Sequence, residues 1–328
     1  MDSDHTQVLL NAVAAAVMAP SSYNTQPWRF RIVGGTTLEI LADVARHLGV
    51  IDRDRRQLVQ SCGCALFNAR VAVRAMGFTD EVTTMPADGA GRGVLATLRL
   101  GPALVQCNDD LALMRALSLR RTNRRPFLSM PVASVEPLID AAARAGAWAV
   151  RLDPEQKRRL GILIDRADQL QYADPEFRAE LARWLTPVGS RRRDGIPFVE
   201  KEYGSALPFS VMRALRSPSL GAELGKTEQE LVSGSPVVVA LGTDGDDLAA
   251  WLASGQALEA MLLEATAIDL SAAFLNQALE VPEQRALIAD LVGRTGYPQM
   301  VLRLGYPGVP FHHAAPRRDL DDVVEIVT

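Results

Sequence analysis

The first apolar stretch of the chain, residues 5–18, repeats its hydrophobic side chains at helical spacing and predicts a helix. Two short runs follow, R-F-R-I-V and T-L-E-I-L-A, and the glycine pair Gly34-Gly35 between them predicts a hairpin. Residues 53–77 then predict a long helix that Gly77 closes, and its second half is apolar enough to be buried.

Helices and strands alternate along the rest of the chain. A loop is predicted over 78–93, and Asp109 or Asp110 is expected to cap the helix that follows the next strand. Asp153 and Pro175 are expected to begin two further helices. The remaining elements are helices over 132–145, 247–268 and 282–294 and strands over 94–101, 148–152, 235–243 and 300–305.

The regular pattern breaks between Thr186 and Lys226. This segment contains several glycines and prolines together with Phe198, Tyr203 and Phe209. A loop-rich segment of this length inside a compact chain is uncommon and is often a lid or a binding loop.

Residues 19–30, A-P-S-S-Y-N-T-Q-P-W-R-F, form a polar corner between the first helix and the first strand. Pro20 and Pro27 restrict its backbone, and the small polar residues between them leave N–H groups and side chains available to a ligand. A capped turn is the alternative explanation for such a segment. Trp28 is expected to pack in the core rather than to contact a ligand.

Two segments of the chain match each other without gaps. Residues 61–78 align with residues 253–270, which pairs Gly63 with Gly255, and each segment is followed by a strand containing L-R-L-G. This order predicts two half-domains packed about a pseudo-two-fold axis, as in a homodimer fused into one chain. Only the first half carries the corner, and only the second carries R-R-T-N-R-R-P-F, the arginine run at 120–127.

Composition and charge indicate whether the chain can form a large core and whether it can bind a nucleic acid. The 328 residues include 48% hydrophobic side chains, enough for a large core, and a net charge of −4 with a pI near 5.7 gives no basic excess to hold a nucleic acid. The N-terminus has no signal-peptide pattern, and no apolar run approaches the ~20 residues of a membrane span. We therefore expect a soluble, cytoplasmic protein with no nucleic-acid or membrane partner.

The residue types that usually indicate metal binding or hydrolytic chemistry are sparse in the sequence. Cys62, Cys64 and Cys107 do not make a disulfide framework and are expected to be buried thiols in a reducing compartment. The four histidines lack metal-ligand spacing, so no metal site is expected. No Ser–His–Asp set, Walker loop or dinucleotide fingerprint is visible in the sequence.

The corner, the arginine run, the S-G-Q-A-L-E helix and the R-L-G-Y-P strand end together resemble the FMN-dependent nitroreductase superfamily. They resemble most closely its actinobacterial Acg-like branch, in which one chain contains both halves of the usual dimer. The resemblance covers most of the chain and implies an α+β fold, with a mixed or antiparallel sheet flanked by helices and two pseudo-two-fold-related halves. The halves are expected at 1–108 and 109–328, with 186–226 as a lid insertion.

The resemblance implies one complete FMN site made within a single chain. Its pseudo-symmetric counterpart is expected to be lost, because 146–152 replaces the corner in the second half. Against the flavin N5 and O4 the resemblance places the stretch that contains Asn276 and Gln277, for which a plain turn is an equal alternative. The other cofactor-binding residues that it implies are Pro20, Ser21, Ser22 and Asn24 from the corner, Arg121, Asn123 and Arg125 from the arginine run, and Arg317 and Arg318 from the tail.

These residue types suit the chemistry of FMN. A phosphate monoester carries close to two negative charges and favours guanidinium partners, which Arg121 and the tail pair could supply. A fixed cation such as Arg125 beside the pyrimidine edge of the flavin would stabilise the charge that develops on reduction. Asn123 stands where the family usually has serine but can still donate to phosphate. The alternative for the arginine run is a solvated basic loop.

The sequence leaves three functions open. The leading one is an oxidoreductase in which NAD(P)H passes hydride to flavin N5 and a nitroaromatic or quinone then takes the electrons in a ping-pong cycle, with no acid–base residue of the protein required. The second is a flavin-sequestering stress protein whose lid at 186–226 excludes nicotinamide. The third is a scaffold that binds no flavin. The protein is expected to act as a monomer that is a pseudo-dimer.

Overall fold

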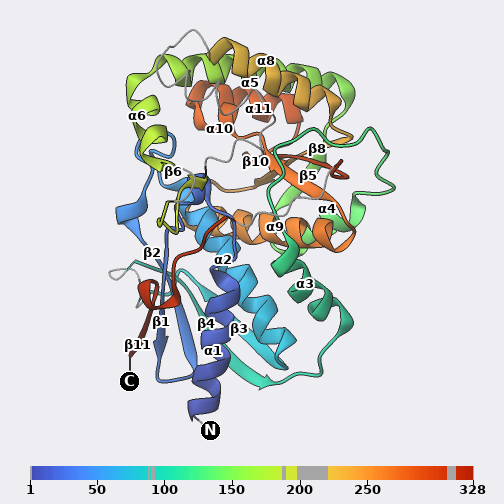
Figure 1. The fold of residues 1–328 in the computed structure, drawn as a ribbon. Coiled ribbons are helices and arrows are strands. Elements are labelled where there is room, and N and C mark those ends of the chain that lie inside the picture. The colour runs from blue at the N-terminus through green and yellow to red at the C-terminus, as the bar shows by residue number, and fades with distance from the viewer. Residues whose placement is uncertain are drawn as a thin grey trace.

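The computed structural model describes residues 2–87, 89, 93–186, 190–197, 221–308 and 315–327, with the backbone alone for 2, 3 and 221–225 (Figure 1). Much of the predicted lid, including Phe198, Tyr203 and Phe209, lies outside the described residues. What is described is an α+β arrangement of two sheets with helices against them, as the sequence predicts.

The first sheet has the strand order β11-β1-β2-β4-β3. Its members are β1 (Trp28–Val33), β2 (Thr37–Ala42), β3 (Phe78–Thr84), β4 (Val94–Ala103) and β11 (Val324–Val327). Trp28, Phe30 and Ile32 alternate inward along β1 and are buried, which confirms the core position predicted for Trp28. The predicted hairpin between β1 and β2 is also confirmed, because Gly34 and Gly35 both have positive φ, at 55° and 67°.

The second sheet repeats this order with other residues. Its order is β5-β8-β10-β9, formed by β5 (Trp148–Arg151), β8 (Val237–Thr243), β9 (Ser271–Phe274) and β10 (Tyr297–Gly305). All neighbours in it are antiparallel, as they are among β1, β2, β4 and β3. The strands β5, β8, β10 and β9 therefore correspond to β1, β2, β4 and β3, and the internal duplication is visible in the topology.

The two central helices, α2 (Arg56–Ala75) and α9 (Leu248–Ala267), cross at the aligned glycines. A Cβ atom on Gly63 would lie 2.3 Å from the carbonyl oxygen of Leu252, and one on Gly255 would lie 2.1 Å from that of Gln60. Gln60 aligns with Leu252 as Gly63 aligns with Gly255, so the two contacts are pseudo-two-fold equivalents. Glycine at both positions allows the helix backbones to touch.

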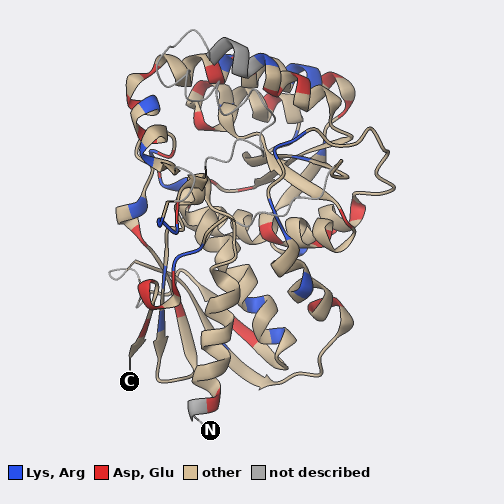
Figure 2. Cartoon of the chain, viewed as in Figure 1, with Lys and Arg blue, Asp and Glu red and all other residues tan. Residues whose placement is uncertain are grey.

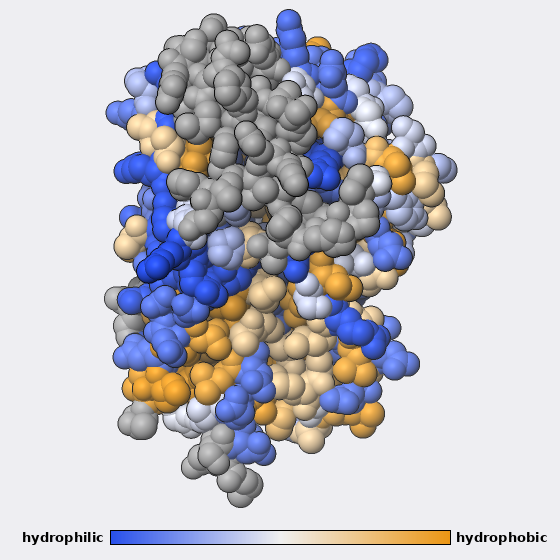
Figure 3. All heavy atoms as spheres, in the orientation of Figure 1, coloured by the Kyte–Doolittle hydropathy of each residue, from blue (hydrophilic) through white to orange (hydrophobic). Residues whose placement is uncertain are grey.

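Helices that precede the first strand of each sheet along the chain pack around this crossing. They are α1 (Asp2–Ala16), which lies against α2, and α3 (Asn108–Leu119) and α4 (Glu136–Arg144), which lie against α9. On the face seen in Figure 3, hydrophobic residues gather in the lower part, where Figure 1 places α1.

The halves differ most between their first two strands. The first half has the short turn at 34–36, whereas residues 152–236 separate β5 from β8 in the second half. This insertion contains α5 (Pro154–Ala173), α6 (Pro175–Trp184), β6 (Leu185–Thr186), β7 (Ile196–Pro197) and α8 (Gly221–Gly234). With α10 (Gln277–Glu280) and α11 (Pro282–Val292), helices α5 and α8 form the upper layer in Figure 1. The predicted Asp153 cap of α5 is present as a capping box with Gln156.

Three expectations about local structure were wrong. Residues 78–84, predicted as loop, form the edge strand β3, whose partly exposed residues give no clear alternation. Cys107, rather than Asp109 or Asp110, caps α3, because its sulfur accepts a hydrogen bond from the Asp110 N–H. Residues 221–226, placed in the irregular segment, belong to α8.

Charged residues of both signs are distributed over both sheets and their helices (Figure 2). Within the described part of the chain, no helix combines the length and hydropathy that crossing a bilayer requires.

Candidate functional site

A cavity of about 540 Å³ lies where the corner, α2, the arginine run and the insertion meet. Its floor includes Gln57, Ser61 and Cys64 from α2 and Leu258 from α9. Residues of the corner and the arginine run, which are about 100 positions apart in the sequence, line it together with tail residues 315–317. A volume of this size suits a cofactor or a substrate of moderate size.

The corner has an unusual backbone. Tyr23, Asn24 and Gln26 all have positive φ, at 52°, 54° and 51°, although none is glycine. Such conformations cost free energy and persist where surrounding contacts stabilise them. The short helical turn η1 (Ser22–Asn24) and the hydrogen bond from the Gln26 N–H to Ser21 Oγ (2.9 Å) hold this shape.

The side chain of Asn24 connects the corner to two distant segments. Its Nδ2 donates to the carbonyl oxygens of Gly195 in the insertion and Pro316 in the tail, both at 3.1 Å, and its Oδ1 accepts from Arg317 Nη1 at 3.2 Å. Gln26 makes a parallel link, since its Nε2 donates to the Arg193 carbonyl oxygen at 2.7 Å. The tail and the insertion are therefore part of the site's wall.

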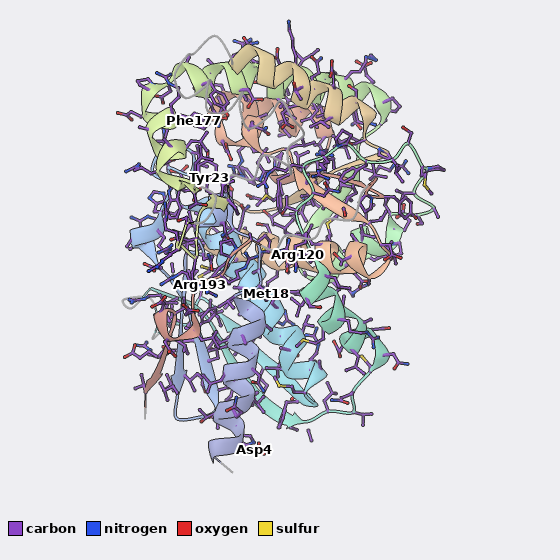
Figure 4. The ribbon with its side chains drawn as sticks, in the orientation of Figure 1. Asp4, Met18, Tyr23, Arg120, Phe177 and Arg193 are labelled. Carbon is purple, nitrogen blue, oxygen red and sulfur yellow. The ribbon has the colours of Figure 1, made fainter. Side chains whose placement is uncertain are left out.

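One end of the cavity is cationic. Arg120, Arg121 and Arg317 all line it, and Arg120 and Arg317 both donate to the carbonyl oxygen of Met18 at the end of the first helical stretch (Figure 4). Desolvation, with repulsion from Arg120 and Arg121, lowers the pKa of Arg317 to about 9. Desolvation and repulsion from Arg120 also lower the pKa of Arg121. The Nε atoms of Arg120 and Arg317 are buried without a hydrogen-bond partner.

A buried carboxyl group lies beside this cationic end. Glu259, fully buried on α9, has its Oε1 3.6 Å from Arg120 Nε. Burial raises the pKa of Glu259 to about 7, although Arg120 and Arg317 oppose the shift. The carboxyl group therefore compensates the guanidinium groups only partly near neutral pH, which leaves this end of the cavity cationic.

Arg303 of β10 fixes the backbone of the arginine run. Its guanidinium donates to the carbonyl oxygens of Arg124 at 2.7 Å and Arg125 at 3.0 Å, and the N–H of Asn123 donates to Ala272 in β9 at 2.9 Å. Asn123 is buried, and its Oδ1 accepts from the Arg125 N–H at 3.1 Å. Asn123 and Arg125 are not among the residues that line the cavity, whereas Arg121 and Arg124 are.

The two arginines of the tail lie in different places. Arg317 lines the cavity, but Arg318 does not. The Arg318 guanidinium donates to the carbonyl oxygens of Gln26 at 3.2 Å and Trp28 at 3.4 Å and lies 3.5 Å from Asp43. In this arrangement Arg318 braces the end of the corner.

Asn276 and Gln277, at the start of α10, both line the cavity. Asn276 is held in place, since its Oδ1 accepts from the Val301 N–H at 3.1 Å and its Nδ2 lies 2.9 Å from Met300 Sδ. The Oε1 of Gln277 is buried without a partner. Of the predicted residues, the structure brings together Pro20, Ser21, Ser22, Asn24, Arg121, Asn276, Gln277 and Arg317.

A chain of hydrogen bonds crosses the cavity away from the arginines. Ser22 Oγ donates to Gln57 Oε1, and Gln57 Nε2 donates to Glu280 Oε1 at 3.0 Å. The other oxygen of Glu280 accepts from Gln171 Nε2 of α5 at 2.7 Å. This chain ties the corner to the insertion. Burial raises the pKa of Glu280, and these hydrogen bonds oppose the rise.

Aromatic and aliphatic side chains line the end of the cavity that contains Glu280. Tyr172 of α5 and Phe177 of α6 meet edge to face with ring centroids 5.2 Å apart, and Leu181 and Ile51 join them in one buried cluster. Tyr23 packs against this cluster from the corner, below Phe177 in Figure 4. Asp168, one turn before Tyr172 on α5, also lines the cavity.

No sequence pattern indicates this acidic, aromatic end of the cavity. Gln57, Asp168, Gln171 and Glu280 come from three helices and form no motif. The insertion was recognised only by its irregular composition after residue 186, whereas α5 and α6 precede that point. The resemblance implies Arg125 rather than Arg124, because the second basic residue of the family's segment matches position 125, whereas the structure places Arg124 at the cavity.

Metal and thiol chemistry find no support at this site. Across the described ranges, no group of three or more His, Cys, Asp or Glu side chains could hold a metal ion. Cys64 lines the cavity, but burial raises the pKa of its thiol far above the ordinary value, which disfavours the reactive thiolate. Cys62 is buried as predicted, whereas Cys107 is exposed, contrary to the expectation of three buried thiols.

Comparison with known proteins supplies the family. The chain is 32% identical over 322 residues to the Mycobacterium tuberculosis protein named "Putative NAD(P)H nitroreductase Rv3131", covering 97% of this chain and 91% of the relative. It is 29% identical over 335 residues to the protein of the same organism named "Putative NAD(P)H nitroreductase acg", covering 98% of this chain and 96% of the relative. No family model matches the chain.

Solved structures with a similar arrangement include nitroreductases. A nitroreductase with bound FMN from Bacteroides fragilis aligns with 62% of this chain and 92% of its own, at 16% identity and a TM-score of 0.39. A nitroreductase-like family protein from Bacillus cereus aligns with 66% of this chain and 95% of its own, at 14% identity and a TM-score of 0.40. The family assignment rests on the sequence relatives: at 32% identity over nearly the full length of both proteins, the chain belongs to the nitroreductase family, in its Acg-like branch.

Proposed function

We propose that the chain is an FMN-binding oxidoreductase of nitroreductase type, which uses NAD(P)H to reduce an electron-poor acceptor such as a nitroaromatic or a quinone. The single observation that carries the proposal is the cationic end of the cavity, where Arg120, Arg121 and Arg317 gather against the corner. The names of the relatives support the nicotinamide and the acceptor class.

The residues present fit the phosphate of FMN. Two buried Nε donors have no hydrogen-bond partner, that of Arg317 and that of Arg120, which lies 3.6 Å from Glu259 Oε1. Desolvation, with repulsion from Arg120 and Arg121, lowers the pKa of Arg317. A phosphate dianion would accept from such donors and relieve the repulsion. Guanidinium groups held by backbone carbonyls, as Arg317 is by Met18 and Ala19, need no rearrangement to bind it.

The ring of FMN would lie between the corner and the start of α10. Pro20, Ser21 and Ser22 would contact it from one side, and Asn276 and Gln277 from the other, with the unpartnered Oε1 of Gln277 able to accept an N–H of the ring. Asn24, Asn123, Arg125 and Arg318 would support these contacts by holding the corner, the arginine run and the tail.

When bound, FMN supplies a centre that can accept hydride from NAD(P)H and pass electrons to the acceptor, and the kinetics expected are ping-pong. The protein's part is to hold the cofactor and exclude water with the apolar side chains of the insertion. The proposed halves are 1–108 and 109–328, with the last strand, β11, paired to β1 of the first half. Since one chain supplies both sides of the cavity, a monomer would be sufficient.

A second candidate, a flavin-sequestering protein with little turnover, is favoured by one observation. The insertion contacts the corner directly, through Gly195 and Arg193, and its Ile196 and Pro197 line the cavity. A wall fastened in this way would retain a flavin and hinder the entry of nicotinamide.

Cofactor binding is tested by adding FMN to the purified protein and measuring native mass. The proposal predicts one FMN for each chain and a particle of one chain. A protein that binds no FMN at high micromolar concentration, or one that requires two chains for each FMN, would refute the site described above. Riboflavin, which lacks the phosphate, serves as the matched ligand and should bind more weakly.

A further inference from the structure

The part of the cavity that α5 lines has a carboxyl oxygen without a hydrogen-bond partner. Asp168 is 4% exposed and lines the cavity, and its Oδ2 is buried without a hydrogen-bond partner. Glu280, the neighbouring carboxyl group, differs because Gln57 and Gln171 each donate to one of its oxygens. An unsatisfied buried acceptor is costly, so Asp168 has the capacity to accept a hydrogen bond from a ligand.

Three further acidic side chains lie close enough to Asp168 to affect its pKa. Asp165 on the same helix, Glu228 on α8 and Glu280 on α10 all act to raise its pKa, in addition to the effect of burial. Burial raises the pKa values of Glu280 and Glu228 too. Arg56 opposes the rise for Glu280, and Arg303 and Arg124 oppose it for Glu228.

The side chains that line the cavity near Asp168 favour ligands of a particular shape. The rings of Tyr23, Tyr172 and Phe177 and the side chains of Ile51 and Leu181 surround this end. Aromatic faces attract flat rings and stabilise cations, most strongly where water is excluded. A metal ion is a poorer match, because no metal-holding cluster exists among the described residues.

We propose that Asp168 and the surrounding aromatic rings form a subsite for a flat aromatic cation that bears N–H donors, such as an amidinium or a protonated amine. The inference rests on the proposed function, since it names the class of acceptor that the same cavity would take. The carboxylate would accept the N–H groups, the rings would cover the aromatic faces, and the arginines at the other end would repel an equivalent cation there.

Ligand binding at this subsite is linked to a proton. Burial, together with repulsion from Glu228 and Glu280, holds the pKa of Asp168 well above its usual value and so favours the protonated carboxyl group in the free protein. A bound cation replaces that proton. The affinity of the protein for the cation therefore rises with pH, up to the pH at which Asp168 is ionised in the free protein. A neutral ligand of the same shape gains nothing from the rise in pH.

The test compares three nitroaromatics of one shape and different charge on the FMN-loaded protein. They are para-nitrobenzamidine, para-nitrobenzamide and para-nitrobenzoate, and their dissociation constants are measured by calorimetry between pH 6 and pH 8. The proposal predicts that the cation binds about tenfold or more tightly than the neutral amide, that the preference grows with pH, and that the anion binds most weakly.

Two variants assign the preference to Asp168. Asp168→Asn should bind the amidine and the amide about equally, while Asp290→Asn, an exposed change of the same kind on α11, should keep the wild-type ratio. Equal binding of cation and amide by the wild-type protein, or an unchanged ratio in Asp168→Asn, overturns the proposal. The wild-type series decides the matter even where a variant does not fold.

Failure of this inference is distinguishable from failure of the proposed function. The FMN content of the protein is measured before the nitroaromatics are added. A protein that holds FMN and shows no charge preference contradicts the cation subsite alone, whereas a protein that holds no FMN contradicts the proposed function.

Discussion

Arg121→Ala tests the cationic end with little disturbance to the fold. The Arg121 side chain is half-buried, and its Nη1 donates to the carbonyl oxygen of the adjacent Arg120 at 2.7 Å. Its removal leaves the corner, the tail and their hydrogen bonds in place. It also removes a repulsion that adds to the effect of desolvation in lowering the pKa of Arg317. The free energy of unfolding should therefore change little.

The expected loss of FMN affinity follows from the charge on phosphate. A hydrogen bond to a charged group contributes about 1.5–3 kcal/mol, which corresponds to about a tenfold to hundredfold change in dissociation constant. Arg121 is only partly shielded from solvent, so the lower half of this range is expected at physiological salt.

The assay is quenching of flavin fluorescence on titration with protein. Arg121→Ala should weaken FMN binding and leave riboflavin binding unchanged, because riboflavin has no phosphate. Arg115→Ala, an exposed change of the same type on α3, should bind both ligands as the wild-type protein does. An unchanged affinity of Arg121→Ala for FMN, or an equal loss for riboflavin, would refute the assignment of Arg121 to the phosphate.

Three further predictions concern packing, pH and thiols. Gly255→Ala places a methyl group 2.1 Å from a backbone oxygen of α2 and should lower the free energy of unfolding, measured in urea, by about 1–3 kcal/mol. The control is Gly234→Ala, whose methyl group meets nothing within 4 Å. Equal stability of the two variants would contradict the close crossing of α2 and α9. Burial raises the pKa of Glu259 to about 7, so protonation of Glu259 stabilises the folded state. This contribution to the free energy of unfolding, about 3 kcal/mol, is lost as pH rises from about 4.5 to 7. Glu259→Gln should be less sensitive to pH over this range, and identical pH profiles would disprove the shift. In native protein a thiol reagent should label Cys107 alone, with the other two thiols reacting only after unfolding; three fast thiols would disprove their burial.

Periodicity sufficed for elements that bury a regular face. The apolar run of β8 is buried along its whole length, and Asp153 begins α5 where its capping pattern predicts. Periodicity failed for β3, an edge strand whose Asp80 and Glu81 bind arginines instead of facing a core. The pairing of β11 with β1 joins the two ends of the chain, and no local pattern could predict it.

The candidate site was predictable where a motif is contiguous. The corner and the arginine run each have local signatures, and the structure brings Ser22 and Arg121 to one cavity. The partners of those motifs were not predictable: Gly195 and Pro316 contact Asn24 through backbone carbonyls, which carry no sequence signal. The acidic end could not be foreseen either, since its residues converge only when α5 and α10 pack together.

The most direct test of the proposed function is anaerobic mixing of the FMN-loaded protein with NADH or NADPH in a stopped-flow instrument. We expect the long-wavelength flavin absorbance to fall after mixing and to return when a nitroaromatic or quinone is added. A flavin absorbance that stays unchanged at saturating NADH and NADPH would contradict the oxidoreductase and leave the flavin-sequestering protein.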